Sequence, residues 1–467
     1  MVVAFSVRIL LRDDLSSAAR LAWFMVMLLG PYVGVVLYLL FGEISLGRTI
    51  HRRHDEIFAQ LDELAGAALG DSDKCLPGNV EVEYQTAFRA ASVDGFQTTL
   101  GNRAELLPDA ASARSRLIED IDRAAESVQV LYYIWLDDNT GRNVAQALIR
   151  AAQRGVVVHA MADAMGSRKF VRSKYWREMR EAGVKLTVAL PMRWVIDTIL
   201  FSRLDLRNHR KITVIDSRIT WCGSQNCADP EFRVKPKFAP WVDIMLRLEG
   251  PVVAQCQLVF ASDWLLNSGE QVPSSFHMRA QEIAGGFPAQ VFADGPTERR
   301  GATPQLFATL LAAARREVVI STPYFVPSPT VLDAIYAASV RGVDVTMIFP
   351  QRNDSWIVAA ASRSNYRQLL MHGVKIREFR NGLLHSKTLT IDRVLSLVGS
   401  TNMDLRSFDL NYENDILLRD DVLTQAIFER QQDYLNQSDS VTMDEVNAWG
   451  YGRRIWNNVI ATVGPVL

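Results

Sequence analysis

Two segments of this 467-residue sequence repeat one set of reactive side chains at one spacing. Each segment follows the pattern H-x-K-x4-D, which supplies His209, Lys211 and Asp216 in the first copy and His385, Lys387 and Asp392 in the second. Each copy then continues into Gly-Ser-x-Asn, which supplies Ser224 and Asn226 in the first copy and Ser400 and Asn402 in the second. The asparagine follows the histidine at the same distance in both copies, so the repeat is not a chance similarity.

These side chains suit chemistry on a phosphate group. In a β-strand, residues two positions apart point to the same face, so the histidine and lysine of each copy project together. An imidazole can attack or donate a proton, an ammonium neutralises charge, and an amide donates a hydrogen bond. Two such edges facing each other would surround one phosphorus, and the lysines would then neutralise charge as Mg²⁺ does in other phosphoryl-transfer enzymes.

The aspartates of the two motifs have the opposite parity and fall where the strand turns back as a hairpin. We therefore expect Asp216 and Asp392 to support the site without touching phosphate. No group of acidic, histidine or cysteine residues has the spacing of a metal cage, and the four cysteines form no CxxC pair. The sequence therefore predicts neither a metal nor a cofactor.

The elements that carry these motifs occur twice. Apolar strands are expected over 126–135 and 316–325, and each is followed by a helix that ends in an Arg-Gly turn, at Arg154 and Arg341. A Gly-Val-Lys triplet follows in both regions, at Gly183 and Gly373. A period near 190 residues indicates two equal units and not a solenoid of short repeats. Alternating strands and helices predict an α/β fold of two pseudo-symmetric lobes, each a mixed β-sheet flanked by helices.

The N-terminal region is apolar and predicts a membrane segment. Residues 21–41 carry no charge, and a helix of about 20 residues spans the hydrocarbon core of a bilayer. The run is too long for a signal peptide, and no small-residue cleavage site follows it. We therefore predict a transmembrane helix over about 21–41 within an anchor at 1–42. Arg48, Arg52 and Arg53 follow the run and favour a cytoplasmic location for the rest of the chain.

The remaining domain boundaries follow from composition. Residues 43–78 are predicted to hold a short amphipathic helix over 55–69 and a polar linker over 71–78, followed by one lobe at 79–285 and a second at 286–467. The chain has 51 basic and 52 acidic residues, which argues against a nucleic-acid partner. Two stretches with interleaved tryptophan and arginine, 192–206 and 449–467, are candidates for contact with lipid or for ordinary packing.

The paired motifs resemble those of the phospholipase D superfamily, and the greatest likeness is to the bacterial cardiolipin synthases. The stretches that carry the likeness are 31–43, 206–211, 241–253, 382–387 and 403–413. The resemblance implies a membrane-bound phosphatidyltransferase of the bacterial inner membrane. One histidine would attack the phosphodiester of phosphatidylglycerol and form a phosphohistidine, while the other protonates the departing glycerol. A second phosphatidylglycerol would then take up the phosphatidyl group and give cardiolipin.

The resemblance also implies carboxylates that orient the histidines. In the superfamily an acidic residue after the Gly-Ser-x-Asn motif bonds the histidine of its own lobe, and Glu413 and Asp243 are the candidates here. Members of the family usually have two hydrophobic N-terminal helices, whereas residues 1–7 are too few to span a bilayer. Three other functions stay open: a hydrolase that uses water at the same site, a nuclease, and an inactive lipid-binding protein. Neutral net charge disfavours the nuclease, and two intact motifs disfavour the inactive protein.

Overall fold

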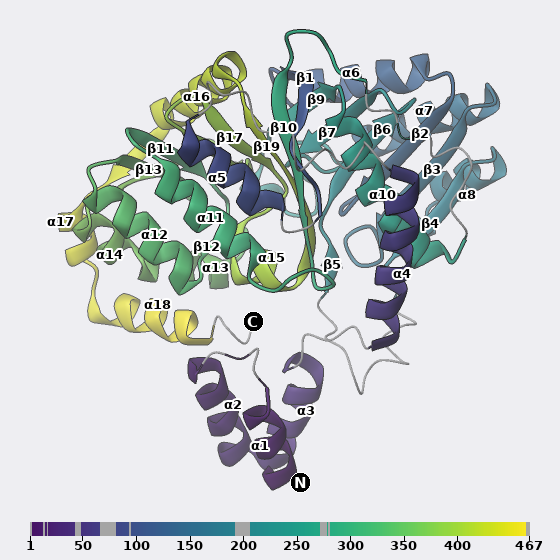
Figure 1. The fold of residues 1–467 in the computed structure, drawn as a ribbon. Helices are drawn as coiled ribbons and strands as arrows, with labels where there is room; N and C mark the ends of the chain where they lie inside the picture. The colour runs from purple at the N-terminus through teal and green to yellow at the C-terminus, as the bar shows by residue number, and fades with distance from the viewer. Residues whose placement is uncertain are drawn as a thin grey trace.

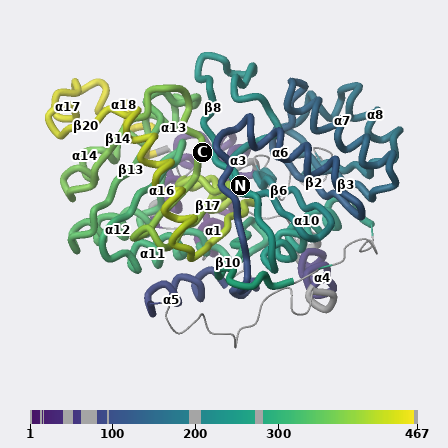
Figure 2. The backbone as a smooth tube through the Cα atoms, turned by 90° about the horizontal axis from the view of Figure 1, so that it is seen from above, coloured from purple at the N-terminus to yellow at the C-terminus, as the bar shows by residue number. Residues whose placement is uncertain are grey.

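The computed structural model of the chain describes residues 2–12, 15, 17–42, 48–65, 81–92, 95–191, 206–270, 278 and 281–463. Two lobes of mixed β-sheet and helices lie side by side, and the N-terminal helices lie beneath them in the view of Figure 1. The same two lobes are seen from above in Figure 2, with the first lobe in blue and teal and the second in green and yellow. The predicted α/β fold with two repeats is confirmed.

The two lobes share one strand order, which runs outward from a central pair of strands. In the first lobe the order from edge to centre is β4 (Lys185–Ala189), β3 (Val157–Asp163), β2 (Ser127–Tyr132), β6 (Lys211–Ile215), β7 (Ile219–Gly223), β9 (Met245–Glu249) and β1 (Thr99–Leu106). In the second it is β20 (Ser438–Val441), β14 (Lys375–Phe379), β13 (Asp344–Pro350), β11 (Glu317–Ser321), β16 (Thr388–Ile391), β17 (Leu395–Gly399), β19 (Asn411–Arg419) and β10 (Phe287–Asp294). Apart from the edge strand β20, the two series correspond strand for strand. Strands β1 and β10 pair antiparallel and join the two halves into one sheet.

Helices cover both halves of the sheet. The first lobe has α6 (Ala110–Arg123), α7 (Asn139–Gln153), α8 (Lys174–Glu181) and α10 (Val252–Ser268). The second has α11 (Ala302–Ala313), α12 (Pro329–Val340), α13 (Trp356–Ser364), α14 (Tyr366–Met371), α15 (Leu405–Asp409), α16 (Asp421–Asn436), α17 (Met443–Asn447) and α18 (Tyr451–Val463). Asp109, Asp138 and Asp420 cap α6, α7 and α16, because each carboxylate accepts a backbone N–H of the first turn.

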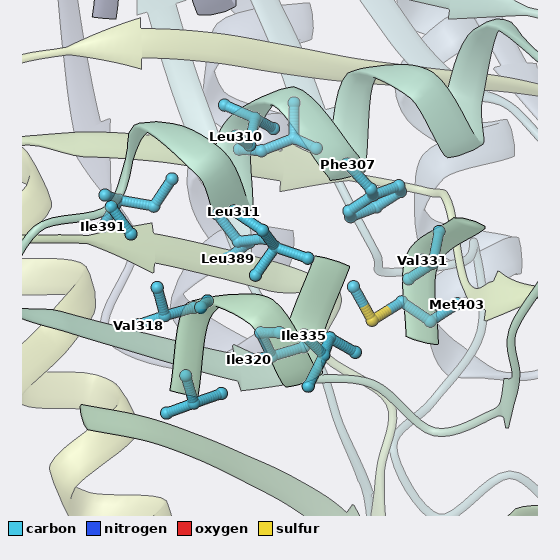
Figure 3. Packing of buried hydrophobic residues seen from close by; sticks show 14 of the residues in the cluster. Phe307, Leu310, Leu311, Val318, Ile320, Val331, Ile335, Leu389, Ile391 and Met403 are labelled. Atoms are coloured by element: carbon cyan, nitrogen blue, oxygen red, sulfur yellow. The ribbon is translucent and has the colours of Figure 1, made fainter. Parts of the chain in front are cut away.

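Aliphatic side chains hold α11 and α12 against the second half of the sheet. Leu310 and Leu311 of α11 and Ile335 of α12 share one buried cluster with side chains of β11 and β16 (Figure 3). Full burial of a leucine or isoleucine contributes roughly 1.5–3 kcal/mol. Helix α5 (Val82–Ala91), which falls at the start of the range predicted for the first lobe, also packs against α11 of the second.

The N-terminal region is a cluster of short helices, so the prediction of one continuous helix over 21–41 is wrong. Helix α1 spans Val2–Leu10, α2 ends at Leu29, and α3 begins at Pro31. Proline has no N–H and its ring collides with the preceding helical turn, so it begins a helix more easily than it continues one. Helices α2 (Ser17–Leu29) and α3 (Pro31–Phe41) pack against each other. Within the described ranges, each helix falls short of the length and apolarity that crossing a bilayer demands.

The predicted amphipathic helix after this region is present but begins earlier. Helix α4 spans Arg48–Ala65 and packs against α10, with Ile57 and Leu61 buried. The Arg53 guanidinium donates to the Leu265 carbonyl at 3.2 Å. The predicted linker over 71–78 lies outside the described residues, as does nearly all of the candidate lipid-contact stretch at 192–206.

Candidate active site

Each catalytic candidate histidine is placed by a short strand that pairs with the other lobe. Strand β5 (Arg207–Asn208) of the first lobe pairs parallel with the start of β19, and the His209 N–H donates to the Tyr412 carbonyl at 2.9 Å. Strand β15 (Leu383–Leu384) of the second lobe pairs parallel with β8 (Trp241–Val242), and the His385 N–H donates to the Val242 carbonyl at 2.8 Å. The two pairings are equivalent, so each lobe extends a strand into the other.

This exchange pairs each histidine with a carboxylate of the opposite lobe. Nδ1 of His209 lies 2.8 Å from Oε2 of Glu413, and Nδ1 of His385 lies 2.6 Å from Oδ1 of Asp243. The expectation that each acid serves its own lobe is therefore wrong, although the two acids themselves were chosen correctly. The reason is the strand pairing, because the residue after Tyr412 lies beside His209 and the residue after Val242 lies beside His385.

Serines of the two Gly-Ser-x-Asn motifs fix these carboxylates. The Ser400 hydroxyl donates to Glu413 at 2.5 Å, and the Ser224 hydroxyl donates to Asp243 at 2.6 Å. Asn411 adds a third bond, since its amide donates to the other oxygen of Glu413 at 3.1 Å. The two serines therefore hold the carboxylates in position, and they occupy equivalent places in the two halves.

The histidines are neutral in this environment. Burial lowers the pKa of His209 to about 4, with Lys211 contributing, although Glu413 opposes the shift. Burial and Lys387 likewise lower the pKa of His385 to about 4 against the opposing effect of Asp243. Burial disfavours ionisation of the two acids, yet the paired histidine brings the pKa of each carboxyl below its ordinary value, through the charge it carries when protonated and through the hydrogen bond it donates. A neutral imidazole that donates Nδ1–H to a carboxylate presents the lone pair of Nε2 as a base or nucleophile.

The two lysines are buried beside the histidines, as the strand period predicts. The Lys387 ammonium donates to the backbone carbonyl of His385 at 2.6 Å, and Lys211 makes the same bond to His209. Burial lowers the pKa of Lys211 to about 8 and that of Lys387 to about 7. An anion that enters between them would restore both charges, because an opposite charge favours the ionised form.

One cavity of about 310 Å³ joins the two halves of the site. His209 and His385 both line it, together with Asn226 and Asn402. The Asn226 side-chain oxygen accepts the Ile134 N–H at 3.2 Å, and the Asn402 amide donates to Ser407 at 3.2 Å. The two motifs therefore meet at one cavity, as would be required for both to act on one phosphorus.

The motif aspartates lie at hairpin turns away from this cavity. Asp216, at φ 51°, accepts the backbone N–H groups of residues 125–127. Asp392, at φ 53°, accepts those of residues 315–317 and the Tyr84 hydroxyl. Each aspartate thus ties its hairpin to the beginning of the neighbouring strand, β2 or β11. The geometry agrees with a supporting role.

Several cavity residues escaped the sequence reasoning. The Tyr133 ring lies edge-on to His209 with centroids 4.9 Å apart, and the Trp241 ring lies 4.4 Å from His385. Arg207 and Arg406 also line the cavity. Trp241 and Arg207 stand two positions before Asp243 and His209, so strand parity could have placed them on the same side as those residues. Across the part of the chain that the structure describes, His, Cys, Asp and Glu form no group able to hold a metal ion.

The duplicated sheet and the paired histidine motifs define a phospholipase D-like enzyme. A phosphatidylserine synthase from Haemophilus influenzae has this fold, with a TM-score of 0.62, 16% identity, and coverage of 82% of this chain and 100% of that protein. The chain belongs to the family described as cardiolipin synthase, phospholipase D-like domain, which matches residues 117–264 and 307–434. Residues 1–43 match the N-terminal region of the phospholipase D-nuclease family.

Curated relatives match the chain over nearly its whole length. Cardiolipin synthase A of Proteus mirabilis strain HI4320 is 34% identical over 461 residues, which cover 96% of this chain and 93% of that protein. Cardiolipin synthase A of Yersinia pseudotuberculosis serotype O:1b is 35% identical over 478 residues, which cover 100% of this chain and 96% of that protein. The resemblance drawn from the sequence motifs is confirmed.

Proposed function

We propose that this protein joins two phosphatidylglycerol molecules into cardiolipin and releases glycerol. The observation that carries the proposal is the pair of neutral histidines, each held by a carboxylate of the other lobe, at one cavity. Such a pair can supply one nucleophile and one acid–base group to the two faces of a phosphodiester. The family assignment supplies the substrate class, since the relatives over the whole chain are cardiolipin synthases.

The reaction proceeds by two displacements at the same phosphorus. Nε2 of one histidine attacks the phosphodiester, a P–N bond forms, and the P–O bond to the departing glycerol breaks. The other histidine, which takes up a proton when the anionic phosphodiester binds, gives that proton to the departing oxygen and becomes neutral again. It then takes the proton of a hydroxyl on a second phosphatidylglycerol, whose oxygen attacks phosphorus as the P–N bond breaks. Lys211 and Lys387 neutralise the phosphoryl oxygens in both steps.

A phospholipase D-type hydrolase is the alternative, because water could take the place of the second lipid. The two activities give different products from cardiolipin. One phosphodiester replaces another in the transfer, so the equilibrium constant lies near unity and excess glycerol should regenerate phosphatidylglycerol. The test is to incubate purified full-length protein with labelled cardiolipin across a glycerol series and separate the lipids. Phosphatidate as the main product at every glycerol concentration would establish the hydrolase instead.

We also propose that the protein works at the inner membrane of a bacterial cell, with both lobes on the cytoplasmic side. The apolar N-terminal helices support the membrane location, since Leu21, Leu28 and Leu29 of α2 and Val33 of α3 are exposed. A second apolar surface, the α18 patch, consists of four residues of α18 and one of α13: Tyr451, Ile455, Trp456, Val459 and Trp356. It lies on the side of the lobes that faces the N-terminal helices in Figure 1.

The α18 patch has the character of an interfacial membrane surface. Its tryptophans Trp356 and Trp456 stack with centroids 5.6 Å apart, and Arg454 is exposed on the same helix. Aromatic and basic side chains together favour the headgroup region of a bilayer. The double variant Ile455→Glu, Trp456→Glu should therefore bind vesicles of phosphatidylglycerol less tightly in flotation than an exposed control, Val422→Glu on α16. Equal flotation of the two variants would show that α18 does not contribute to membrane binding.

A further inference from the structure

The two halves of the active-site cavity are unlike, although the machinery around the histidines is repeated. Arg207 stands two positions before His209, and the equivalent residue before His385 is Leu383. Asn411 stands two positions before Glu413, and the equivalent residue before Asp243 is Trp241. Strand pairing sets Arg207 beside Asn411 and Leu383 beside Trp241. One polar pair and one apolar pair therefore occupy equivalent places at the two histidines.

A second arginine enlarges the polar side. Arg406 follows Asn402 by the same number of positions that separate Pro230 from Asn226, so proline replaces arginine in the first copy. Arg406 and Arg207 both line the cavity. Both also lower the pKa of the Tyr133 hydroxyl, which burial and Asp163 raise overall, and the Tyr133 ring lies against His209. The two guanidinium groups thus act on one region, at the His209 end of the cavity.

The opposite side of the cavity is apolar. The Trp241 ring stacks on Phe232 with centroids 3.9 Å apart, and Ile134, Leu136 and Val234 also line the space. Leu383 behind them is fully buried. This wall offers contact to hydrocarbon or to the carbon skeleton of glycerol.

The acidic side chains at the cavity have bonding partners of their own. Asp354 lies 2.7 Å from the Lys235 ammonium and accepts the Tyr324 hydroxyl at 2.6 Å, so its charge is already balanced. Asp404 accepts the Ser407 N–H at 2.7 Å as the cap of α15, and burial raises its pKa to about 6. Glu413 is bonded to His209. Asp163 and Asp404 lie near the two arginines, since Arg207 acts to lower the pKa of Asp163 and Arg406 that of Asp404, although burial raises both pKa values overall. An anion that binds the two guanidinium groups would therefore bind beside these acids.

We propose that Arg207 and Arg406, with Asn411, form a binding site for the phosphodiester of the acceptor lipid. The proposal rests on the cardiolipin synthase function proposed above. Cardiolipin carries two phosphates joined by one glycerol, so a second anion must be held one glycerol away from the phosphorus that reacts. The lysines serve the reacting phosphate, and guanidinium groups bind a phosphodiester through paired, charge-assisted hydrogen bonds. An alcohol that carries its own phosphate is thereby selected over water and over neutral alcohols.

The test is a competition between two soluble acceptors for the phosphatidyl group of labelled phosphatidylglycerol. Glycerophosphoglycerol carries a phosphodiester and primary hydroxyls, whereas 1,3-propanediol carries primary hydroxyls and no charge. Both are supplied together to the full-length protein, and the ratio of the two new lipids is measured. This ratio depends on the choice of acceptor alone, because both products form from the same intermediate in the same reaction. Partial loss of folded protein leaves the ratio unchanged.

The wild-type protein should favour glycerophosphoglycerol, and Arg207→Gln and Arg406→Gln should each reduce the ratio by about tenfold, the effect of losing one charged hydrogen bond. Arg406→Lys should reduce it less, because it keeps the charge. Arg172→Gln, on an exposed side chain outside the cavity, should leave the ratio at the wild-type value. Wild-type ratios in both glutamine variants would overturn the acceptor site. Failure of the wild-type protein to form either product would instead overturn the transferase function on which it rests.

Discussion

At the scale of single residues, the site is defined by imidazoles that are neutral and held in one orientation. The carboxylate at Nδ1 of each histidine fixes the tautomer that offers Nε2 to the cavity. Burial keeps both rings uncharged until an anion enters. A bound phosphodiester then favours protonation of one imidazole, which supplies the acid that the departing glycerol needs.

Replacing either histidine should therefore abolish turnover. His209→Ala and His385→Ala should each lower kcat by about 10³-fold or more, because both groups act in the same two displacements. The measurement is the initial rate of cardiolipin formation from labelled phosphatidylglycerol. His372→Ala provides the control, since that histidine stacks on Tyr336 outside the cavity. A histidine variant that is folded and retains more than about a tenth of the wild-type rate, a loss under ~1.4 kcal/mol, contradicts the two-histidine mechanism.

The carboxylates should act on the histidine of the opposite lobe. Glu413→Gln should lower kcat by about 10²-fold or more with a much smaller change in KM, since the acid orients a catalytic group and lies behind it. It should also lower the pKa of His209, because the carboxylate favours the imidazolium, and should leave the titration of His385 nearly unchanged. Nitrogen NMR of labelled histidine distinguishes the two rings. Asp243→Asn is the matched variant. It should lower the pKa of His385 and leave the titration of His209 nearly unchanged.

The pKa values of the two lysines predict how kcat/KM declines at alkaline pH. Lys387 has a pKa of about 7 and Lys211 of about 8 in the empty site, so each loses its positive charge as the pH rises through that value. The value of kcat/KM should therefore decline above about pH 7. Lys387→Arg keeps its charge at every relevant pH and should move the decline to higher pH, even if the maximal rate is lower. An unchanged limb in that variant would assign the decline to another group.

At the scale of secondary-structure elements, two aspartates tie the motif hairpins to the neighbouring strands. Asp392→Ala removes the acceptor of three backbone N–H groups and of a buried tyrosine hydroxyl, and should lower the free energy of unfolding by about 2–4 kcal/mol. Asp216→Ala removes three bonds that are more exposed to water and should cost about half as much. Urea unfolding measures both. Equal losses of unfolding free energy in the two variants would show that the buried bond from the Tyr84 hydroxyl contributes no stability.

The sequence predicted elements whose signals are local and missed those that depend on distant chain segments. The strand period placed His209 and Lys211 on one face, and the turn placed Asp216 correctly, because these relations lie within a few residues. The partner of His209 depends on the pairing of β5 with β19, about two hundred residues away in the sequence, and no local pattern encodes it. Uniform hydropathy over 21–41 concealed a helix boundary that Pro31 imposes.

At the scale of the whole molecule, the chain supplies its own cations at the reacting centre. Lys211 and Lys387 are buried beside the two histidines, and each donates to the backbone carbonyl of the histidine two positions before it. We therefore expect chelation with EDTA to leave cardiolipin formation largely intact in a detergent-solubilised assay. Divalent ions should act only by screening anionic lipid. Complete loss of activity that one particular divalent ion restores would contradict this expectation.

The crossed strands also set an order of events during synthesis. A ribosome that has released only the first lobe presents His209 with neither Glu413 nor the second histidine, because both lie further along the chain. Asp243 likewise has no histidine to bond until His385 has been synthesised. A half-made chain is therefore inert toward the lipids around it, and reactivity begins only when the last partner of each pair has emerged and folded.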